Sequence, residues 1–204
     1  MMKKVKVTYS EHSYFNNLIS ENPILLDLGS CLGAFTRHFM TIYPTSTVIL
    51  LEPSKSNYNR IDIENKNVTK IFGALSHKKE TLIFNEDPNS EQNGSLLFNY
   101  FENPIEYPVN TYTLDELCSG FETIDLVKMD IEGAEWDCIM NTSNDTFNKI
   151  RQITVEFHDF LNPEFRINSE KCVDRLLSLG FEIDYNPTDY KYGSKYYDSL
   201  FYKL

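Results

Sequence analysis

One apolar run in this chain leads directly into a group of acidic residues. The segment 124–136, IDLVKMDIEGAEW, begins with β-branched and apolar residues and continues into Asp130, Glu132 and Glu135 around Gly133. The apolar part is typical of a strand buried in a parallel sheet. Burying a carboxylate without a partner is costly, and ligands of open α/β sheets bind at the carboxyl ends of the strands. The segment therefore predicts an α/β sheet with a ligand or a metal at the end of this strand.

The rest of the chain supplies strands and helices in alternating order. In the first part, strands are expected over residues 23–28, 47–51 and 68–72, with helices between them over 33–44 and 54–64. This order, with short connections, implies a parallel, right-handed, doubly wound sheet. After the central segment we expect a strand over 153–157, a helix over 169–179 and two strands, 182–185 and 199–202, that form an antiparallel pair at the sheet edge.

The middle of the chain is less regular. Short strands over 80–84 and 109–112 flank a polar loop, residues 85–108. Residues 1–22 are predicted to be a short N-terminal extension, and residues 23–204 a single domain large enough to bury a full core. On the two longest helices, the apolar spacing predicts the buried residues Phe35, Phe39 and Ile42, and Val173, Leu176 and Leu177.

The charge and the cysteines restrict the partners and the compartment. The chain has 30 acidic and 19 basic residues and a net charge of -11, which works against binding a nucleic-acid backbone. Its four cysteines are far apart and have no CxxC spacing, so we expect reduced thiols. No apolar run reaches the length of a membrane span or a signal peptide. These features predict a cytoplasmic protein without a membrane span.

A glycine-containing turn follows the first predicted strand. Residues 27–33, DLGSCLG, have the form DxGxxxG and open a helix, and glycines in such a turn let the backbone approach a ligand closely. A dinucleotide fingerprint would instead read GxGxxG. Asp27 favours a cationic or zwitterionic ligand, because its carboxylate attracts a positive group. Glu52, which ends the next strand about 20 residues later, is placed to accept the ribose hydroxyls of a nucleoside.

Together, the motifs DLGSCLGAFT, LEPS, IDLVKMDIEGAEW and ITVEFHDF strongly resemble the FkbM-type branch of the class I S-adenosylmethionine-dependent methyltransferases, over residues 23–204. The resemblance implies a seven-stranded, Rossmann-like sheet, mostly parallel with an antiparallel C-terminal strand, and S-adenosyl-L-methionine as cofactor. It also implies the cofactor-binding residues Asp27, Gly29, Ser30, Gly33, Glu52, Ala74 and Asp130. Family members often have Asn where this chain has Gly73, so backbone contacts at Ala74 are expected to replace side-chain recognition of the adenine.

Methyl transfer to a hydroxyl requires removal of the hydroxyl proton. The candidates follow two neighbouring strands: Asp130 and Glu132 after one, Glu156 and His158 after the next. His158 is our predicted base, since imidazole titrates near neutrality, with Asp130 and Glu156 beside it; a histidine that is only hydrogen-bonded at a strand end is the alternative. Glu132, Glu156 and His158 are also possible ligands of a divalent ion such as Mg²⁺. Glu135 lies on the first turn of a helix, where an acid is favourable in any case.

Three further features are assigned less chemistry. Three histidines have no second ligand or catalytic residue at a characteristic spacing, so we expect no chemical role for His12, His38 and His77. Residues 93–96 form either a loop that closes over the cofactor or acceptor or a plain turn. The tyrosine-rich tail, with Tyr196 and Tyr197, either stacks on a sugar or packs at the sheet edge.

The sequence predicts a methyltransferase that acts on a hydroxyl of a sugar, a glycan precursor or a secondary metabolite. A methyltransferase acting on nucleic acid or protein is one alternative, and the acidic charge counts against it. A cofactor-binding module without catalysis is the other, and the presence of Asp27, Glu52, Asp130 and His158 counts against that. A homodimer is possible.

Overall fold

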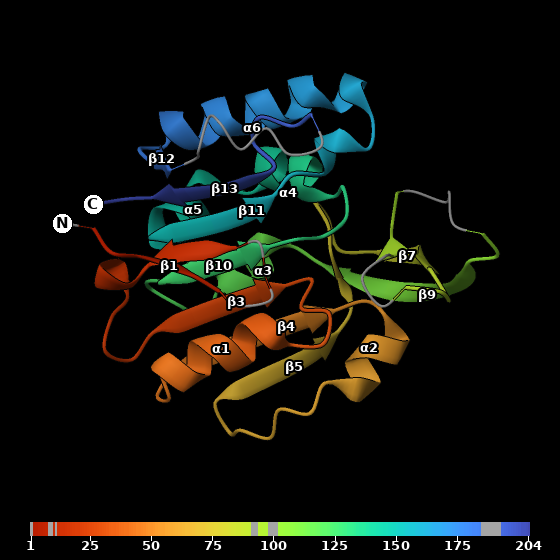
Figure 1. The fold of residues 1–204 in the computed structure, drawn as a ribbon, viewed down its shortest axis with the longest axis horizontal. Coiled ribbons are helices and arrows are strands. Elements are labelled where there is room, and N and C mark those ends of the chain that lie inside the picture. Colours follow the sequence, from red (N-terminus) through yellow and green to blue (C-terminus); the bar gives the residue numbers. More distant parts are fainter. Residues whose placement is uncertain (1, 8–9, 11, 91–93, 98–101, 185–192) are drawn as a thin grey trace.

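A seven-stranded sheet runs through the centre of the molecule (Figure 1). The computed structural model describes residues 2–7, 10, 12–90, 94–97, 102–184 and 193–204. The strands lie in the order β12-β13-β11-β10-β3-β4-β5. Their bounds are Ile24–Leu28 (β3), Thr47–Glu52 (β4), Val68–Phe72 (β5), Leu126–Met129 (β10), Gln152–Glu156 (β11), Glu182–Asp184 (β12) and Asp198–Tyr202 (β13). All neighbouring pairs from β5 to β11 are parallel, and β13 is antiparallel to both of its neighbours, so the predicted doubly wound sheet is confirmed.

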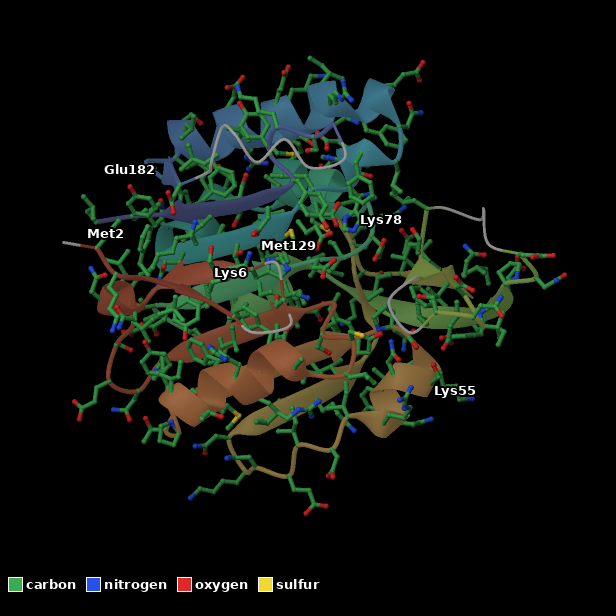
Figure 2. The ribbon with its side chains drawn as sticks, viewed as in Figure 1. Met2, Lys6, Lys55, Lys78, Met129 and Glu182 are labelled. Atoms are coloured by element: carbon green, nitrogen blue, oxygen red, sulfur yellow. The ribbon has the colours of Figure 1, made fainter. Side chains whose placement is uncertain are left out.

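Helices cover both faces of this sheet (Figure 1). They are α1 (Ala34–Ile42), α2 (Lys55–Arg60), α3 (Leu114–Cys118), α4 (Glu135–Asn141), α5 (Asn144–Lys149) and α6 (Arg166–Ser178). Alternate strand residues point to opposite faces, so Leu25 packs with α1 residues in one core while Leu26 packs with residues of α4 and α6 in a larger one. Met129, at the end of β10, lies deep inside the molecule (Figure 2).

Residues before β3 pack onto the sheet. A hairpin of β1 (Lys4–Lys6) and β2 (Ser13–Phe15) is followed by a short 3₁₀ turn, η1 (Asn16–Leu18). The Gln152 side chain accepts a hydrogen bond from the Phe15 backbone N–H at 2.7 Å and donates one to the Phe15 carbonyl at 3.1 Å. Tyr14 is completely buried. The segment expected to be a short extension therefore forms part of the packed core beside β11.

The middle of the chain forms a second, smaller sheet at one side of the molecule (Figure 1). Its strands are β6 (Ala74–Leu75), β7 (Thr81–Glu86), β8 (Gly94–Ser95) and β9 (Ile105–Tyr112), in the order β6-β9-β7-β8. The expected loop over 85–108 was therefore too long, because both ends of it extend the β7–β9 pairing. After β5, Ala74 and Leu75 form a short strand that pairs with β9. Phe84, Val109 and Ala74 form a separate small core that stabilises this arrangement.

Three local expectations on the helices were wrong. Helix α2 ends at Arg60 rather than near residue 64, because Lys70 Nζ binds the carbonyl groups of Tyr58 and Ile61 and so satisfies this helix end. Ile42 is 45% exposed, since Tyr43 packs on Phe39 in its place. Leu177 is 41% exposed, because the residue next to the buried Leu176 is turned about 100° around the helix.

Candidate active site

A cavity of about 1280 Å³ opens at the carboxyl ends of β3, β4, β10 and β11. Many of the predicted site residues line it, namely Gly29, Ser30, Glu52, Ala74, Asp130, Glu132, Glu156 and His158. They come from segments up to about 130 residues apart, and they meet because parallel strands end at the same edge of a sheet. Residues of the small sheet, including Gly94 and Leu96, and Tyr197 of the tail also line the cavity. Asn93 lies outside the described residues.

Gly29 connects the first turn to the end of β10. Its φ is +74°, and a Cβ placed on it would lie 1.7 Å from the carbonyl oxygen of Asp130. Any larger residue would push the two segments apart. The Gly29 and Ser30 N–H groups both donate to the Leu51 carbonyl, at 3.0 and 3.1 Å. Gly33, also left-handed at +75°, is the N-cap residue of α1. The turn that contains Gly29 and Ser30 therefore forms one wall of the cavity. At position 29, only a glycine fits against the Asp130 carbonyl group.

Asp27 lies beneath the cavity rather than on its wall. Its Oδ2 accepts a hydrogen bond from Thr36 Oγ1 at 2.6 Å, and its Oδ1 is 3.8 Å from Lys128 Nζ. Lys128 is a residue that the sequence analysis missed. It is buried, donates to the Gly29 carbonyl and lies 3.3 Å from Asp130 Oδ2. Burial alone would lower the pKa of Lys128, but the carboxylates of Asp130 and Asp27 outweigh it and raise that pKa.

Asp130 lies where the wall formed by the glycine turn after β3 meets the wall formed by the ends of β10 and β11. Burial favours its neutral form, but the ammonium of Lys128 holds the pKa of this carboxyl well below its ordinary range. Asp130 is therefore a permanent negative charge on the cavity wall.

Glu52 is held by the backbone at the end of β4. Its Oε2 accepts the Cys31 N–H at 2.6 Å, and its Oε1 accepts the Ser54 N–H at 2.8 Å. Burial raises the pKa of Glu52 to about 8, despite these two hydrogen bonds and the charge of Lys128. Since a carboxylate has about four acceptor positions, each oxygen keeps one for a ligand in the cavity.

His158 is enclosed by carboxylates. Its Nδ1 lies 3.0 Å from Glu135 Oε1, and its Nε2 lies 3.3 Å from Glu132 Oε2 and 3.8 Å from Asp130 Oδ1. Burial would lower the pKa of His158, but Glu135 and Glu132 together raise it well above its ordinary value. The ring therefore carries a proton at neutral pH.

Glu135 does more than complement the dipole of its helix. Its side chain is fully buried, and its carboxylate accepts the backbone N–H groups of Ile131 and Gly133 at 3.1 to 3.2 Å as well as facing His158. Glu132 between them has a φ of +53°, and its carbonyl accepts a hydrogen bond from Ser95 Oγ at 2.8 Å. The turn after β10 is thus held by the Glu135 carboxylate on one side and by the Ser95 hydroxyl on the other.

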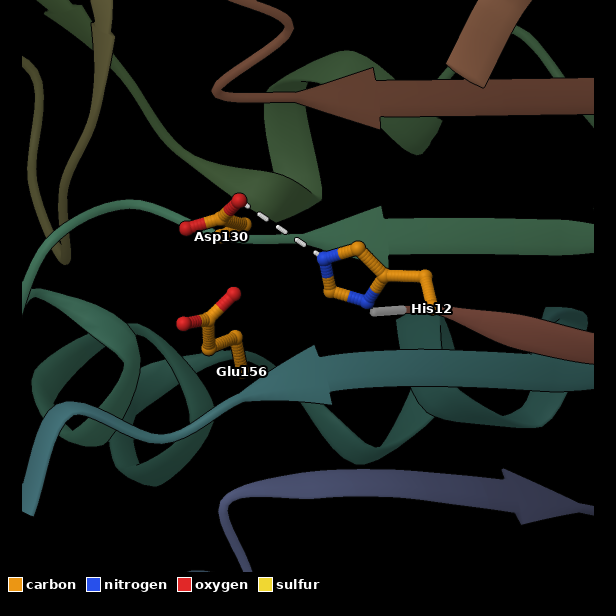
Figure 3. Close-up of side chains that lie close together, drawn as sticks. All are labelled: His12, Asp130 and Glu156. Carbon is orange, nitrogen blue, oxygen red and sulfur yellow. Dashed lines mark ion pairs between the residues drawn. The ribbon is translucent and has the colours of Figure 1, made fainter. Parts of the chain in front are cut away.

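The structure adds His12 to the cavity wall, although the sequence analysis assigned it no chemistry. Figure 3 shows its ring beside Asp130 and Glu156. Burial and the charge of Asp130 raise the pKa of Glu156 to about 7. His12, Asp130 and Glu156 place three potential metal-ligand atoms within 4.8 Å of one another, and so do Asp130, Glu132 and His158. Within the described part of the chain, the predicted set Glu132, Glu156 and His158 is divided between these two groups.

The comparisons with known proteins agree with this geometry. Residues 27–183 match the family described as Methyltransferase FkbM domain. The chain belongs to this family. The FkbM match includes the turn after β3, Glu52, and the strand ends that carry Asp130 and His158, whereas His12 and Tyr197 lie outside it.

Two curated relatives and one solved structure are similar to this FkbM chain. The 2-O-methyltransferase NoeI of Sinorhizobium fredii is 29% identical over 161 residues, which cover 68% of this chain and 64% of NoeI. The methyltransferase sdnD of Sordaria araneosa is 22% identical over 190 residues, 74% of this chain and 72% of sdnD. The crystal structure of methyltransferase FkbM from Methylobacillus flagellatus KT superposes with a TM-score of 0.57 at 13% identity, covering 95% of this chain and 46% of that one. The last likeness concerns the fold, which is that of the class I methyltransferases.

In the described residues, no helix has the length and apolar character needed to cross a membrane.

Proposed function

We propose that this FkbM domain transfers a methyl group from S-adenosyl-L-methionine to a hydroxyl group of a small molecule or glycan. One observation carries the proposal: a single cavity contains both the Glu52 carboxylate beside the glycine turn and a carboxylate–imidazole group at the ends of β10 and β11. The first suits a nucleoside and the second suits a hydroxyl that must lose a proton. The name of the relative NoeI, a 2-O-methyltransferase, supports a hydroxyl as the acceptor group.

The residues on the β3 and β4 side fit this cofactor. Glu52 has an acceptor position left on each oxygen, as two neighbouring ribose hydroxyls require. The close packing of Gly29 leaves the turn without side-chain bulk, with Ser30 on the cavity wall. Ala74 lies on the wall where backbone contacts to an adenine are proposed, and Asp130 supplies negative charge for the cofactor's amino group. When bound, the cofactor supplies an activated methyl group on a positively charged sulfur.

The residues at the ends of β10 and β11 fit the acceptor. His158 is the proposed base: Glu135 holds its Nδ1, so its Nε2 is directed to the cavity side, where Glu132 lies. A base must be neutral before it accepts a proton, and the raised pKa of His158 makes the neutral ring a minor form at neutral pH. Glu156, on the same wall, is placed to hold the acceptor hydroxyl.

The cofactor assignment is tested by calorimetry with S-adenosylhomocysteine. Wild-type protein should bind it, and Glu52→Ala should weaken binding about 10- to 100-fold, because two hydrogen bonds are lost at about 0.5–1.5 kcal/mol each. Glu64→Ala, which changes an exposed glutamate, is the matched control. Absence of binding to the wild type, or equal binding by Glu52→Ala, would refute the assignment.

The base assignment is tested by the pH dependence of methyl transfer from labelled cofactor to a panel of sugar hydroxyls. The rate should rise from neutral to alkaline pH, and His158→Ala should remove this dependence together with most of the turnover. Glu135→Gln removes the charge that most raises the pKa of His158, so the rising limb should move to lower pH. Asp137→Asn, on the exposed side of the same helix, should leave the limb in place. A limb that Glu135→Gln does not move would contradict the role of Glu135 as a positioning residue.

The cytoplasmic location and the homodimer stay predictions. The net charge of -11 continues to count against a nucleic-acid acceptor.

A further inference from the structure

The buried ring of His12 has one nitrogen that lacks a hydrogen-bond partner. The side chain is 2% exposed. Its Nδ1 lies 3.0 Å from Thr154 Oγ1, whereas its Nε2 makes no hydrogen bond within the described residues. The nearest carboxylate oxygen to Nε2 is Oδ2 of Asp130, at 3.6 Å, and this contact is an ion pair only when the ring is protonated. Buried side-chain nitrogens without a partner are uncommon in folded proteins, so this one requires an explanation.

The surroundings of His12 allow its Nε2 to act as a ligand. Two oxygen atoms lie beside Nδ1, Thr154 Oγ1 at 3.0 Å and Asp198 Oδ1 at 3.7 Å. The Thr154 hydroxyl can accept a proton from Nδ1 as well as donate one. A bound cation would select the tautomer with the proton on Nδ1, because the lone pair of Nε2 is then directed toward the space beside Asp130.

The carboxylate of Glu156 completes the group. Figure 3 shows His12, Asp130 and Glu156 turned toward the same space, from the start of β2, the end of β10 and the end of β11. One imidazole nitrogen and two carboxylate oxygens lie within 4.8 Å of one another. We propose that these three side chains bind one divalent cation. A mixed nitrogen and oxygen set suits Mn²⁺, Fe²⁺ or Zn²⁺ better than Mg²⁺, which prefers oxygen ligands.

The second group of potential ligands has no need of a cation. In Asp130, Glu132 and His158, both nitrogens of the imidazole already face carboxylates, Glu132 at 3.3 Å and Glu135 at 3.0 Å. His158 is thus the positive partner within its own group. The carboxylates that face His12 are farther away, Asp198 at 3.7 Å from Nδ1 and Asp130 at 3.6 Å from Nε2. The hydrogen bond of Nδ1 goes to the neutral Thr154, and Nε2 makes none within the described residues.

The charge balance of this wall also favours an added cation. The wall and the layer beneath it contain five carboxyl groups, Asp27, Asp130, Glu132, Glu135 and Glu156, and their basic neighbours are Lys128, His158 and His12. A cation would compete with the proton of Glu156, whose pKa is raised to about 7. Three protein ligands leave coordination positions open on a divalent ion, and all three side chains line the cavity. An acceptor hydroxyl bound there would lose its proton more readily; this last step rests on the proposed function, whereas the cation site does not.

In the experiment, MnCl₂ is titrated into cofactor-free protein. Binding is measured by calorimetry and by the loss of the electron paramagnetic resonance signal of free Mn²⁺. Wild-type protein should bind one Mn²⁺ per chain, and ZnCl₂ should displace it. His12→Ala and the nearly isosteric Glu156→Gln should each weaken binding about 10-fold or more. His77→Ala, at an exposed histidine, should leave the affinity unchanged, and Glu132→Gln, in the other group, should weaken binding less than either ligand variant. Circular dichroism verifies that each variant is folded, and Glu156→Gln keeps the test decisive if His12→Ala does not fold.

Four outcomes would overturn the proposal. They are no saturable binding of Mn²⁺ or Zn²⁺ by the wild type, binding by His12→Ala and Glu156→Gln equal to that of the wild type, loss of binding in Glu132→Gln, and displacement of Mn²⁺ by S-adenosylmethionine but not by S-adenosylhomocysteine, whose sulfur is neutral. The last would assign the wall to the cofactor's positive sulfur. Binding of S-adenosylhomocysteine is measured on the same samples, so loss of the cation site and loss of the proposed function are distinguished.

Discussion

Glu52 provides a quantitative test of how burial controls the cofactor side of the cavity. The perturbation is Glu52→Gln, which keeps the shape of the side chain and removes its titration. In the folded protein, burial raises the pKa of Glu52 from 4.5 to about 8. At about 1.4 kcal/mol per pH unit, this difference corresponds to at most about 5 kcal/mol that opposes ionisation in the fold.

The sign follows from proton binding. Between about pH 4.5 and about pH 8, folded Glu52 keeps a proton that the unfolded chain releases, so its contribution to stability is present at low pH and is lost as the pH rises through this interval. Glu52→Gln has no such loss. It does place an amide NH₂ next to one of the two backbone N–H donors that Glu52 accepts, which costs about 1–3 kcal/mol at any pH.

The variant should therefore be less stable than the wild type at about pH 5 and more stable at about pH 9, with the difference in unfolding free energy changing by up to about 5 kcal/mol. Urea denaturation of cofactor-free protein at both pH values measures this, and the titrations of all other groups cancel in the comparison. A difference that stays constant with pH would refute the reasoning. It would mean that the hydrogen bonds from Cys31 and Ser54 and the charge of Lys128 fully offset the burial of the carboxylate.

Two further substitutions test the contact between the two walls. Gly29→Ala should destabilise the fold by about 2 kcal/mol or more, because it combines a left-handed φ with a Cβ 1.7 Å from the Asp130 carbonyl oxygen. Gly120→Ala is the control: a Cβ at this position meets nothing within 4 Å, so stability should change by less than about 0.5 kcal/mol. Equal effects of the two substitutions in urea denaturation would contradict the close packing of Gly29. Lys128→Met should cost about 3–5 kcal/mol at neutral pH, because it leaves buried carboxylates without their cation. Adding Asp27→Asn should recover part of that loss, and a double variant no more stable than Lys128→Met would show that Asp27 is not stabilised by the lysine.

The strands and the position of the site could be predicted because both depend on local pattern and on one rule of parallel sheets. Short apolar runs marked β3, β4, β5, β10 and β11, and acidic residues at their carboxyl ends marked the cavity. Helices α3 and α5 also had local signals that were overlooked, since Thr113 and Ser143 accept hydrogen bonds from backbone N–H groups as N-caps.

The roles of individual residues depend on contacts that no local pattern contains. Asp27 was read as facing the ligand, but Thr36 and Lys128 hold it under the cavity floor. Lys128 is visible as a charge within an apolar run, yet its partners come from two other segments. His12 reaches the cavity only because the N-terminal hairpin packs beside β11, and its partner Thr154 is 142 residues away.

The strand order has a practical consequence for how the protein can be shortened. The residues that match the FkbM family end at 183, but β13 (Asp198–Tyr202) lies between β11 and β12 in the sheet. A fragment trimmed to the matched region would separate β12 from the sheet and expose the edge of β11. It would also remove His12 and Tyr197 from the cavity wall. Residues outside the region of family likeness therefore contribute to both the sheet and the cavity, and expression of the matched region alone is expected to yield aggregated protein.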